Sequence, residues 1–230
     1  MSRLWTHPPA LLEQRRRAWE AFVADPAADV SGLVREHVGR IACVVDAGCG
    51  AGQELLPYLR DAVCVGADVS APTLALAASL LRGRDADARL TLLRARVEAL
   101  PLRAQRADVV ICRLTLQHTD VRRALSEIAR VLRPGGGGGV TFHHHRYYLR
   151  KLAGAARAAD LRPVVYALRV LLTGLCFHLS GTQRRILGMG VTSLTRTRVR
   201  RMAAAVGLDL VGELPAGSAL APQLLFRRRE

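Results

Sequence analysis

The chain has 230 residues, of which 50% are apolar and 23% are charged, a composition typical of a globular protein with room for one α/β domain. Its formal net charge of +15 makes nucleic acid a candidate partner, although the abundance of Arg and Ala is also what a GC-rich coding sequence would produce. The five cysteines show no zinc-ligand spacing, which argues against a metal site and favours a reducing, cytoplasmic compartment.

Membrane-directed segments are not expected from the sequence. Residues 1–9 lack the apolar core of a signal peptide. The longest charge-free apolar stretch, residues 170–183, is too short to span a bilayer. We therefore predict a cytoplasmic protein with no transmembrane segment.

The first predicted element is a helix over residues 10–24, which ends at Asp25-Pro26. One face of this helix carries apolar residues, namely Leu11, Leu12, Ala18, Trp19, Phe22 and Val23. The basic run at residues 15–17 is predicted to form a solvated face on the other side. A second helix, capped by Asp29 or Ser31, is expected to lead into the first strand.

Residues 41–52, with the sequence IACVVDAGCGAG, combine a short apolar strand, the carboxylate of Asp46 and a glycine-rich turn. A helix-compatible segment follows at residues 53–60. Glycines let the backbone approach a ligand that a Cβ would exclude, and the N–H groups of the following helix face the same space. Gln53 occupies the place of the third glycine of the dinucleotide pattern G-x-G-x-x-G. Asp46 would repel a pyrophosphate and attract an ammonium group.

The second predicted strand, residues 62–67, ends at Asp68, about twenty residues beyond the first glycine, where an acidic side chain suits a ribose diol. The two carboxylates around a glycine turn therefore favour a nucleoside with a cationic amino-acid tail over a dinucleotide.

The remaining core alternates between helices and strands. Ser70 is predicted to cap a helix that runs to about residue 82, with Pro72 in its first turn. Strands are predicted at residues 90–95 and 106–112, the second a nearly continuous apolar run typical of a strand buried on both faces. A helix capped by Asp120 follows, with inward residues Leu125, Ile128, Val131 and Leu132. We interpret the five glycines at 135–139 as a flexible surface turn without chemistry, before a fifth strand at 140–143.

The segment 146–193 departs from this alternation. It contains an apolar, helix-compatible stretch at 164–179 and many basic residues with Asp160 as its only acid. A buried cap helix and a membrane-surface helix both explain the stretch, and the buried helix is the simpler interpretation. A helix at 195–206 then ends at Gly207, followed by strands at 208–214 and 223–227. Strands that alternate with helices imply right-handed crossovers and a parallel sheet, whose carboxyl edge would carry the ligand.

Five motifs, in this order and spacing, resemble the class I S-adenosylmethionine-dependent methyltransferases, especially small-molecule and quinone-type relatives. The motifs are VDAGCGAG at 45–52, GADVS at 66–70, EALPL at 98–102, ADVVIC at 107–112 and RVLRPGG at 130–136. The resemblance implies a Rossmann-like, seven-stranded, mostly parallel sheet with helices on both faces and an antiparallel hairpin at its edge. It implies one domain, 1–230, made of N-terminal helices (1–40), a cofactor-binding core (41–145), a helical cap insert after strand 5 (146–193) and a C-terminal helix and hairpin (194–230). The N-terminal helix would then be a lid over the ligand pocket.

The resemblance also implies S-adenosylmethionine as donor, released as S-adenosylhomocysteine. The implied contacts are Asp46, Ala47, Gly48, Cys49, Gly50 and Gly52 around the methionine moiety, Asp68 at the ribose, Val69, Arg96 and Val97 around the adenine, and Arg113 and Leu114 in a covering loop. Arg96 stands where the family commonly has an acid that accepts from the adenine amino group, and arginine has no acceptor. Either the backbone around Val97 recognises the adenine, or Glu98 reaches in, or donor affinity is reduced, as in a degenerate relative.

Three histidines are candidates for a general base or an acceptor contact: His118, His143 and His145. Alternation along a strand would direct His143 and His145 to one face and His144 to the other. The alternative for each is a structural role in a loop or strand end. A metal site would need a third ligand of another origin, and none is evident. Methyl transfer mainly requires that donor and nucleophile be held in line and water excluded.

The predicted function is therefore O-, N- or C-methylation of a small-molecule acceptor, in secondary metabolism or on a quinone-like compound. The apolar and basic insert would suit a flat, partly hydrophobic or anionic substrate. Nucleic-acid methylation is the rival, prompted by the net charge and by Arg196, Arg198, Arg200 and Arg201. Few aromatics and no base-flipping signature disfavour it. The sequence does not indicate an oligomeric state.

Overall fold

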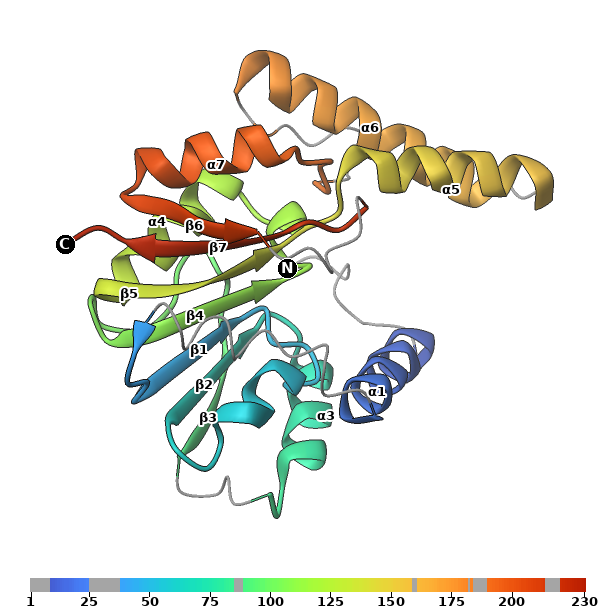
Figure 1. The fold of residues 1–230 in the computed structure, drawn as a ribbon. Helices are drawn as coiled ribbons and strands as arrows, with labels where there is room; N and C mark the ends of the chain where they lie inside the picture. The colour runs from blue at the N-terminus through green and yellow to red at the C-terminus, as the bar shows by residue number, and fades with distance from the viewer. Residues whose placement is uncertain are drawn as a thin grey trace.

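The computed structural model describes residues 9–24, 38–84, 89–158, 161–181, 183, 190–213 and 220–230. Within these ranges one seven-stranded sheet has the order β3-β2-β1-β4-β5-β7-β6 (Figure 1). The strands are β1 (Cys43–Ala47), β2 (Val63–Asp68), β3 (Leu90–Arg94), β4 (Ala107–Arg113), β5 (Leu132–Thr141), β6 (Leu208–Glu213) and β7 (Gln223–Arg228). The first five pair in parallel, and β7 is antiparallel to both β5 and β6. The predicted Rossmann-like sheet with an edge hairpin is confirmed.

The strand order reverses at β1, which pairs with β2 on one side and β4 on the other. In a parallel sheet this reversal leaves a crevice at the carboxyl ends of the two central strands, because their connections leave toward opposite faces. The turn after β1 and the loop after β4 therefore border the same space.

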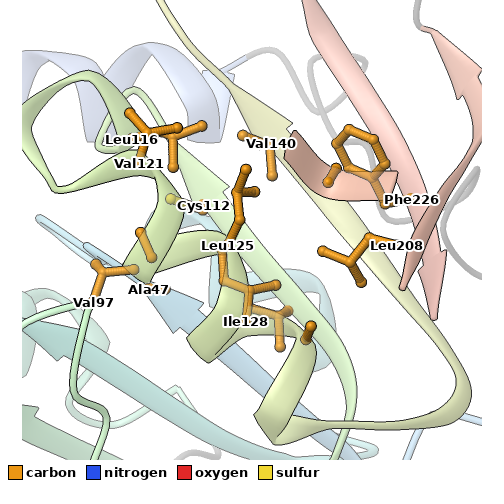
Figure 2. Close-up of a cluster of buried hydrophobic side chains, with 14 of the residues drawn as sticks. Ala47, Val97, Cys112, Leu116, Val121, Leu125, Ile128, Val140, Leu208 and Phe226 are labelled. Atoms are coloured by element: carbon orange, nitrogen blue, oxygen red, sulfur yellow. The ribbon is translucent and has the colours of Figure 1, made fainter. Parts of the chain in front are cut away.

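Helices cover both faces of the sheet, and alternate residues of the strands meet them. Val44, Val109 and Ile111 pack with α1 (Pro9–Ala24), α3 (Ala71–Leu81) and the 3₁₀ helix η3 (Gln53–Tyr58). On the other face, Val110 and Cys112 pack with α4 (Val121–Val131) and α7 (Arg196–Ala205), as Figure 2 shows for part of this cluster. The two-residue period of β4 thus divides the core into two layers.

The helix caps predicted at Ser70 and Asp120 are confirmed. Each side chain accepts a hydrogen bond from the backbone N–H three residues later, at the start of α3 and α4. Thr195 caps α7 in the same way. Residues 53–60 differ from expectation only in type, because the segment forms a short 3₁₀ helix with Pro57 inside it. Proline lacks the N–H that a continuing α-helix would need.

The predicted surface turn at residues 135–139 is wrong. Strand β5 begins directly after α4, and the glycines from 136 to 139 are buried between β4 and β7. A Cβ on Gly138 would lie 1.8 Å from the carbonyl oxygen of Val110, and one on Gly137 would lie 2.8 Å from that of Phe226. The glycines are therefore strand residues at a place where neighbouring backbones approach closely.

The insert after β5 is a helical hairpin of α5 (His145–Ala158) and α6 (Leu161–Ser180), which Figure 1 shows projecting past the sheet. The two helices share a small apolar cluster that includes Tyr148, Ala167 and Val170. Alone among the described helices, α6 is long and apolar enough to cross a membrane by length and composition. The sequence prediction counted only charge-free residues and stopped at Arg169.

Two helices were predicted before β1, and the structure describes only the first. The second helix, with its caps at Asp29 and Ser31, lies outside the described residues. Helix α1 buries Trp19 and Phe22, as expected, but Ala18 and Val23 are exposed. The predicted apolar face was therefore too wide.

Candidate donor and acceptor site

The glycine turn after β1 has a backbone that side chains would obstruct. Gly48, Gly50 and Gly52 have φ angles of +89°, +54° and +82°, in the left-handed region that glycine enters freely. The N–H groups of Gly48 and Cys49 donate to the carbonyl of Ala67 at 2.7 and 3.0 Å, which ties the turn to the end of β2. A Cβ on Gly48 would lie 2.3 Å from Thr115 Oγ1. The turn is thus a fixed backbone cradle.

Asp68, the last residue of β2, is held beside this cradle by backbone donors. Its Oδ2 accepts from the N–H of Gly50 at 3.1 Å, and its Oδ1 accepts from the N–H of Ser70 at 2.9 Å. A carboxylate oxygen accepts more than one hydrogen bond, so both oxygens keep capacity for a ligand hydroxyl.

Asp46 is a buried carboxylate that lacks a hydrogen-bond partner in the described part of the chain. It is 1% exposed, and neither oxygen has a hydrogen-bond partner among the described residues. Burial raises its pKa well above the ordinary value, the nearby carboxylates of Glu54 and Asp68 raise it further, and Arg113 and Arg15 oppose the shift. Buried polar groups are normally satisfied, so this orphaned acid at the end of β1 marks a place for a cationic ligand group.

Arg15 reaches the same turn from α1, which the sequence analysis did not foresee. Its Nη1 lies 3.1 Å from the position of a Cβ on Gly50, and its Nε is buried without a hydrogen-bond partner in the described structure. The prediction of a solvated basic face is wrong for this residue. The spacing contained a signal, because Arg15, Trp19 and Phe22 fall at i, i+4 and i+7, on the buried face of the helix.

The loop after β4 closes over the turn. Arg113 Nη1 forms an ion pair with Glu54 Oε1 at 2.5 Å. Leu114 has a φ of +52°, uncommon for a residue with a Cβ, and its N–H donates to the carbonyl of Thr141 at 2.8 Å. The side chain of Thr115 lies against Gly48. These contacts fix Arg113 and Leu114 at the edge of the cradle, where the sequence placed them.

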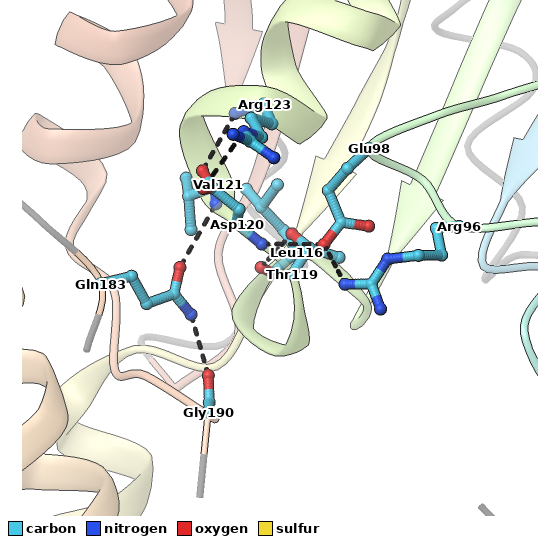
Figure 3. A network of polar contacts seen from close by, with 9 residues as sticks. All are labelled: Arg96, Glu98, Leu116, Thr119, Asp120, Val121, Arg123, Gln183 and Gly190. Atoms are coloured by element: carbon cyan, nitrogen blue, oxygen red, sulfur yellow. Dashed lines mark hydrogen bonds and ion pairs between the residues drawn. The ribbon is translucent and has the colours of Figure 1, made fainter. Parts of the chain in front are cut away.

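A cavity of about 310 Å³ lies beyond Asp68, lined by Val69, Arg94, Ala95 and Arg96. These residues include two of those predicted to surround an adenine, and the third, Val97, is buried. Glu98 does not point into it: Oε1 accepts from Arg96 at 2.9 Å and from the N–H of Asp120 at 3.0 Å (Figure 3). The arrangement therefore favours backbone groups over Glu98 as acceptors for a ligand here.

His143 lies on the acceptor side of the cradle in a fixed orientation. Gln117 Nε2 donates to the carbonyl of Leu114 at 2.9 Å, and because a carbonyl only accepts, this contact identifies the amide nitrogen. The same nitrogen lies 3.4 Å from His143 Nδ1, so Nδ1 is the acceptor and the neutral ring carries its proton on Nε2. The ring stacks on Tyr147, with centroids 4.0 Å apart. Burial, His118 and Lys151 lower its pKa to about 4.

His118 is a neighbour of His143, whereas His145 is not. Desolvation and the charge of Arg15 lower the pKa of His118, although the residue is exposed at the surface. The prediction that His145 shares a face with His143 is wrong, because β5 ends at Thr141 and α5 begins at His145. The ring of His145 instead lies 4.0 Å from that of His144.

The structure gives less support to a metal site and to a nucleic-acid surface at the arginines around α7. No group of three metal-ligating side chains occurs within the described ranges. Of the four arginines around α7, Arg196 pairs with Glu213 at 2.5 Å, and the guanidinium of Arg198 lies over the ring of Phe177. Only Arg200 and Arg201 are exposed, which weakens the case for a nucleic-acid surface.

Residues 45–137 match the family model of a methyltransferase domain. The chain is 39% identical over 154 residues, 66% of its length and 54% of the relative, to the malonyl-[acyl-carrier protein] O-methyltransferase of Enterobacter lignolyticus (strain SCF1). It is 32% identical over 94 residues, 39% of its length and 36% of the relative, to the uncharacterized methyltransferase YcgJ of Bacillus subtilis (strain 168). The chain thus spans about half or less of the curated relatives that it matches.

Two solved structures illustrate the likeness of fold. YcgJ from Bacillus subtilis aligns with a TM-score of 0.58 at 20% identity, over 86% of this chain and 97% of that one. Geranyl diphosphate C-methyltransferase from Streptomyces coelicolor A3(2), solved with Mg²⁺, geranyl-S-thiolodiphosphate and S-adenosyl-L-homocysteine, aligns with a TM-score of 0.59 at 13% identity, over 86% and 74%. Residues 45–137 therefore match a methyltransferase domain, and the chain shares the fold of these solved structures, in agreement with the resemblance drawn from its five motifs.

Proposed function

We propose that the protein transfers a methyl group from S-adenosylmethionine to a small-molecule acceptor. The observation that carries the proposal is the buried carboxylate of Asp46 at the edge of a glycine cradle, where it has no hydrogen-bond partner among the residues that the structure describes. An ammonium group would satisfy this carboxylate, whereas a pyrophosphate would be repelled by it. The matched methyltransferase domain supports the same assignment.

Each part of the donor has a complementary group in the cradle. Asp46 would hold the ammonium and Asp68 the ribose hydroxyls, while the cavity beside Val69 and Arg96 would take the adenine. Arg15 would hold the carboxylate of the methionine moiety, since its guanidinium already lies over Gly50. The sides of the donor pocket would be formed by Ala47, Cys49, Val97, Arg113 and Leu114. Bound there, the donor supplies an electrophilic methyl group on a sulfonium.

The acceptor would enter between the loop after β4 and the α5–α6 hairpin. His118 is neutral at pH 7, because its pKa is lowered, and it would take a proton from an oxygen or nitrogen nucleophile. His143 would donate from Nε2 and orient the acceptor, since Gln117 occupies its Nδ1. The stacked Tyr147 supplies a flat apolar wall. His145 faces elsewhere and has no part in this proposal.

The proposal includes a small-molecule acceptor, a single domain and a cytoplasmic location. The malonyl-[acyl-carrier protein] O-methyltransferases and the geranyl diphosphate C-methyltransferase act on small or carrier-bound acyl and prenyl groups by their names, which favours a small-molecule acceptor. The domain organisation predicted for residues 1–230, with a cap at 146–193, fits this use. The free cysteines fit a cytoplasmic compartment.

The test is calorimetric binding of two nucleosides to the wild-type protein and to Asp46→Asn. S-Adenosylhomocysteine carries the ammonium group, and 5′-methylthioadenosine does not. We expect the variant to lose about 100-fold in affinity for the first and little for the second, because only the first has a charge for Asp46 to pair with. If neither nucleoside binds to the wild-type protein at millimolar concentration, the proposal is refuted and a degenerate relative is favoured.

A further inference from the structure

Helix α6 has two apolar faces, and only one of them is used inside the protein. Its inner face, with Ala167, Val170, Gly174 and Phe177, is buried. Its opposite face exposes an outer leucine stripe, defined as Leu161, Val165, Leu168, Leu172, Leu175 and Leu179. The spacing alternates between four and three residues, which keeps all six on one side of an α-helix.

The stripe is a continuous apolar surface. Its exposed fractions range from 47% at Leu168 to 80% at Leu179. Six of the ten exposed large hydrophobic residues in the described structure belong to it, and the others include Val23, Val63 and Val211 on separate elements. Single exposed apolar residues are ordinary, but a contiguous patch marks a surface that binds something. The expectation of a buried cap helix is therefore only half right.

The charged residues within the two described helices have one sign. Arg146, Arg150 and Lys151 are exposed on α5, and Arg162 is exposed on α6. Neither helix contains Asp or Glu within its described residues. A leucine face on a helix pair whose described charged residues are all basic is the pattern of a hairpin that lies on an anionic membrane.

We propose that the α5–α6 hairpin docks on an anionic lipid bilayer. Helix α6 lies along the interface, with the outer leucine stripe in the headgroup boundary and the basic residues against lipid phosphates. It does not cross the bilayer, because its inner face packs on α5 and the core, and because Arg162 and Arg169 interrupt its apolar length. The hairpin follows directly from β5, so docking would bring the acceptor side of the cleft close to the lipid surface.

A second copy of the chain is a poorer occupant of the stripe. Residues 161–179 span fewer than the roughly three to four heptads that identify a coiled coil. Pairing two copies would also bring basic residues against basic residues, without acids on these helices to offset them, in molecules of net charge +15. An anionic bilayer has the complementary charge.

Flotation with lipid vesicles tests the proposal without donor or acceptor, so its outcome is independent of methyl transfer. We expect the wild-type protein to float with vesicles of phosphatidylcholine mixed with phosphatidylglycerol, weakly with phosphatidylcholine alone, and less at high salt. The triple variant Leu168→Ser, Leu172→Ser, Leu175→Ser should lose binding by about tenfold or more. Val63→Ser, at an equally exposed site on the sheet, is the matched control.

A second variant covers the case in which the triple variant does not fold. Leu179→Trp places an indole at the most exposed position of the stripe, and its fluorescence should shift to the blue on anionic vesicles. The proposal is overturned by absence of flotation with anionic vesicles, by equal flotation of the wild type and a folded triple variant, or by an unshifted Leu179→Trp emission. Concentration-dependent dimerisation that the triple variant abolishes, without vesicle binding, would assign the stripe to a second copy instead.

Discussion

The proposed donor side and the proposed acceptor side of the site are built by different means. On the donor side, the cradle, Asp46 and Asp68 come from two consecutive strands and the turn between them, and backbone groups set most of the geometry. On the acceptor side, His143 is positioned by Gln117 from one loop and Tyr147 from a helix, through side-chain contacts. Backbone-built sites tolerate few changes, whereas side-chain-built sites vary without loss of the fold.

The largest effect should follow removal of the donor-side carboxylate at the end of β2. Asp68→Ala should weaken binding of S-adenosylhomocysteine by about 100-fold, the loss of two hydrogen bonds from ribose hydroxyls to a charged acceptor. Calorimetry measures it, with Asp61→Ala, an exposed carboxylate before the same strand, as the control. Unchanged affinity in Asp68→Ala would place the nucleoside elsewhere and break the comparison.

Alanine substitutions in the glycine cradle should destabilise the fold most where the added Cβ collides with a neighbouring atom. Gly48→Ala should lower the free energy of unfolding by about 2 kcal/mol or more, because its φ is +89° and the new Cβ would collide with the side chain of Thr115. Gly50→Ala should lower it by only about 1 kcal/mol, because the neighbour is the flexible end of Arg15. Urea denaturation compares the two, and an equal loss would contradict the assigned contacts.

The same difference explains what could be predicted from sequence. The strand–turn–strand unit was predictable because its signals are local: apolar runs, glycines and acids at strand ends within twenty-odd residues. The run at 135–139 was misjudged because glycine indicates both turns and close backbone approach, and only its pairing with β4 and β7 decides between them. His145 was misplaced because the end of β5 depends on where α5 docks. Arg15 was missed because the docking of α1 through Trp19 and Phe22 is a long-range contact.

Arg15 gives a third prediction, on the boundary between the two regions. Arg15→Met should weaken S-adenosylhomocysteine binding by about tenfold through loss of a charged contact to the carboxylate. Binding of 5′-methylthioadenosine, which has no carboxylate, should not change. Arg16→Met, at an exposed position on the same helix, serves as the matched control. Equal losses for both ligands would mean that α1 acts only as a cover over the cleft.

The smallest effect concerns the acceptor side and pH. Burial lowers the pKa values of His143 and His144 to about 4, whereas an unfolded histidine titrates near 6.5. Above pH 6.5 both states are neutral and the full stability is present. As the pH falls from 6.5 toward 4, the two histidines become protonated in the unfolded chain but stay neutral in the folded protein. The free energy of unfolding therefore declines. The pKa values of these rings are lowered further by nearby positive charges, those of Lys151 and His118 at His143 and that of Arg146 at His144.

His144 is buried but His143 is partly exposed to solvent, so screening at His143 reduces the effect to about 1 kcal/mol between pH 7 and pH 5. Urea denaturation at the two pH values measures it. His143→Gln should make the decline shallower, because glutamine does not titrate, and the part due to His144 should remain. If His143→Gln declines as steeply as the wild type, the ring is solvated in the folded protein. The stacked, Gln117-bound arrangement that orients the acceptor would then have to be replaced by a mobile one.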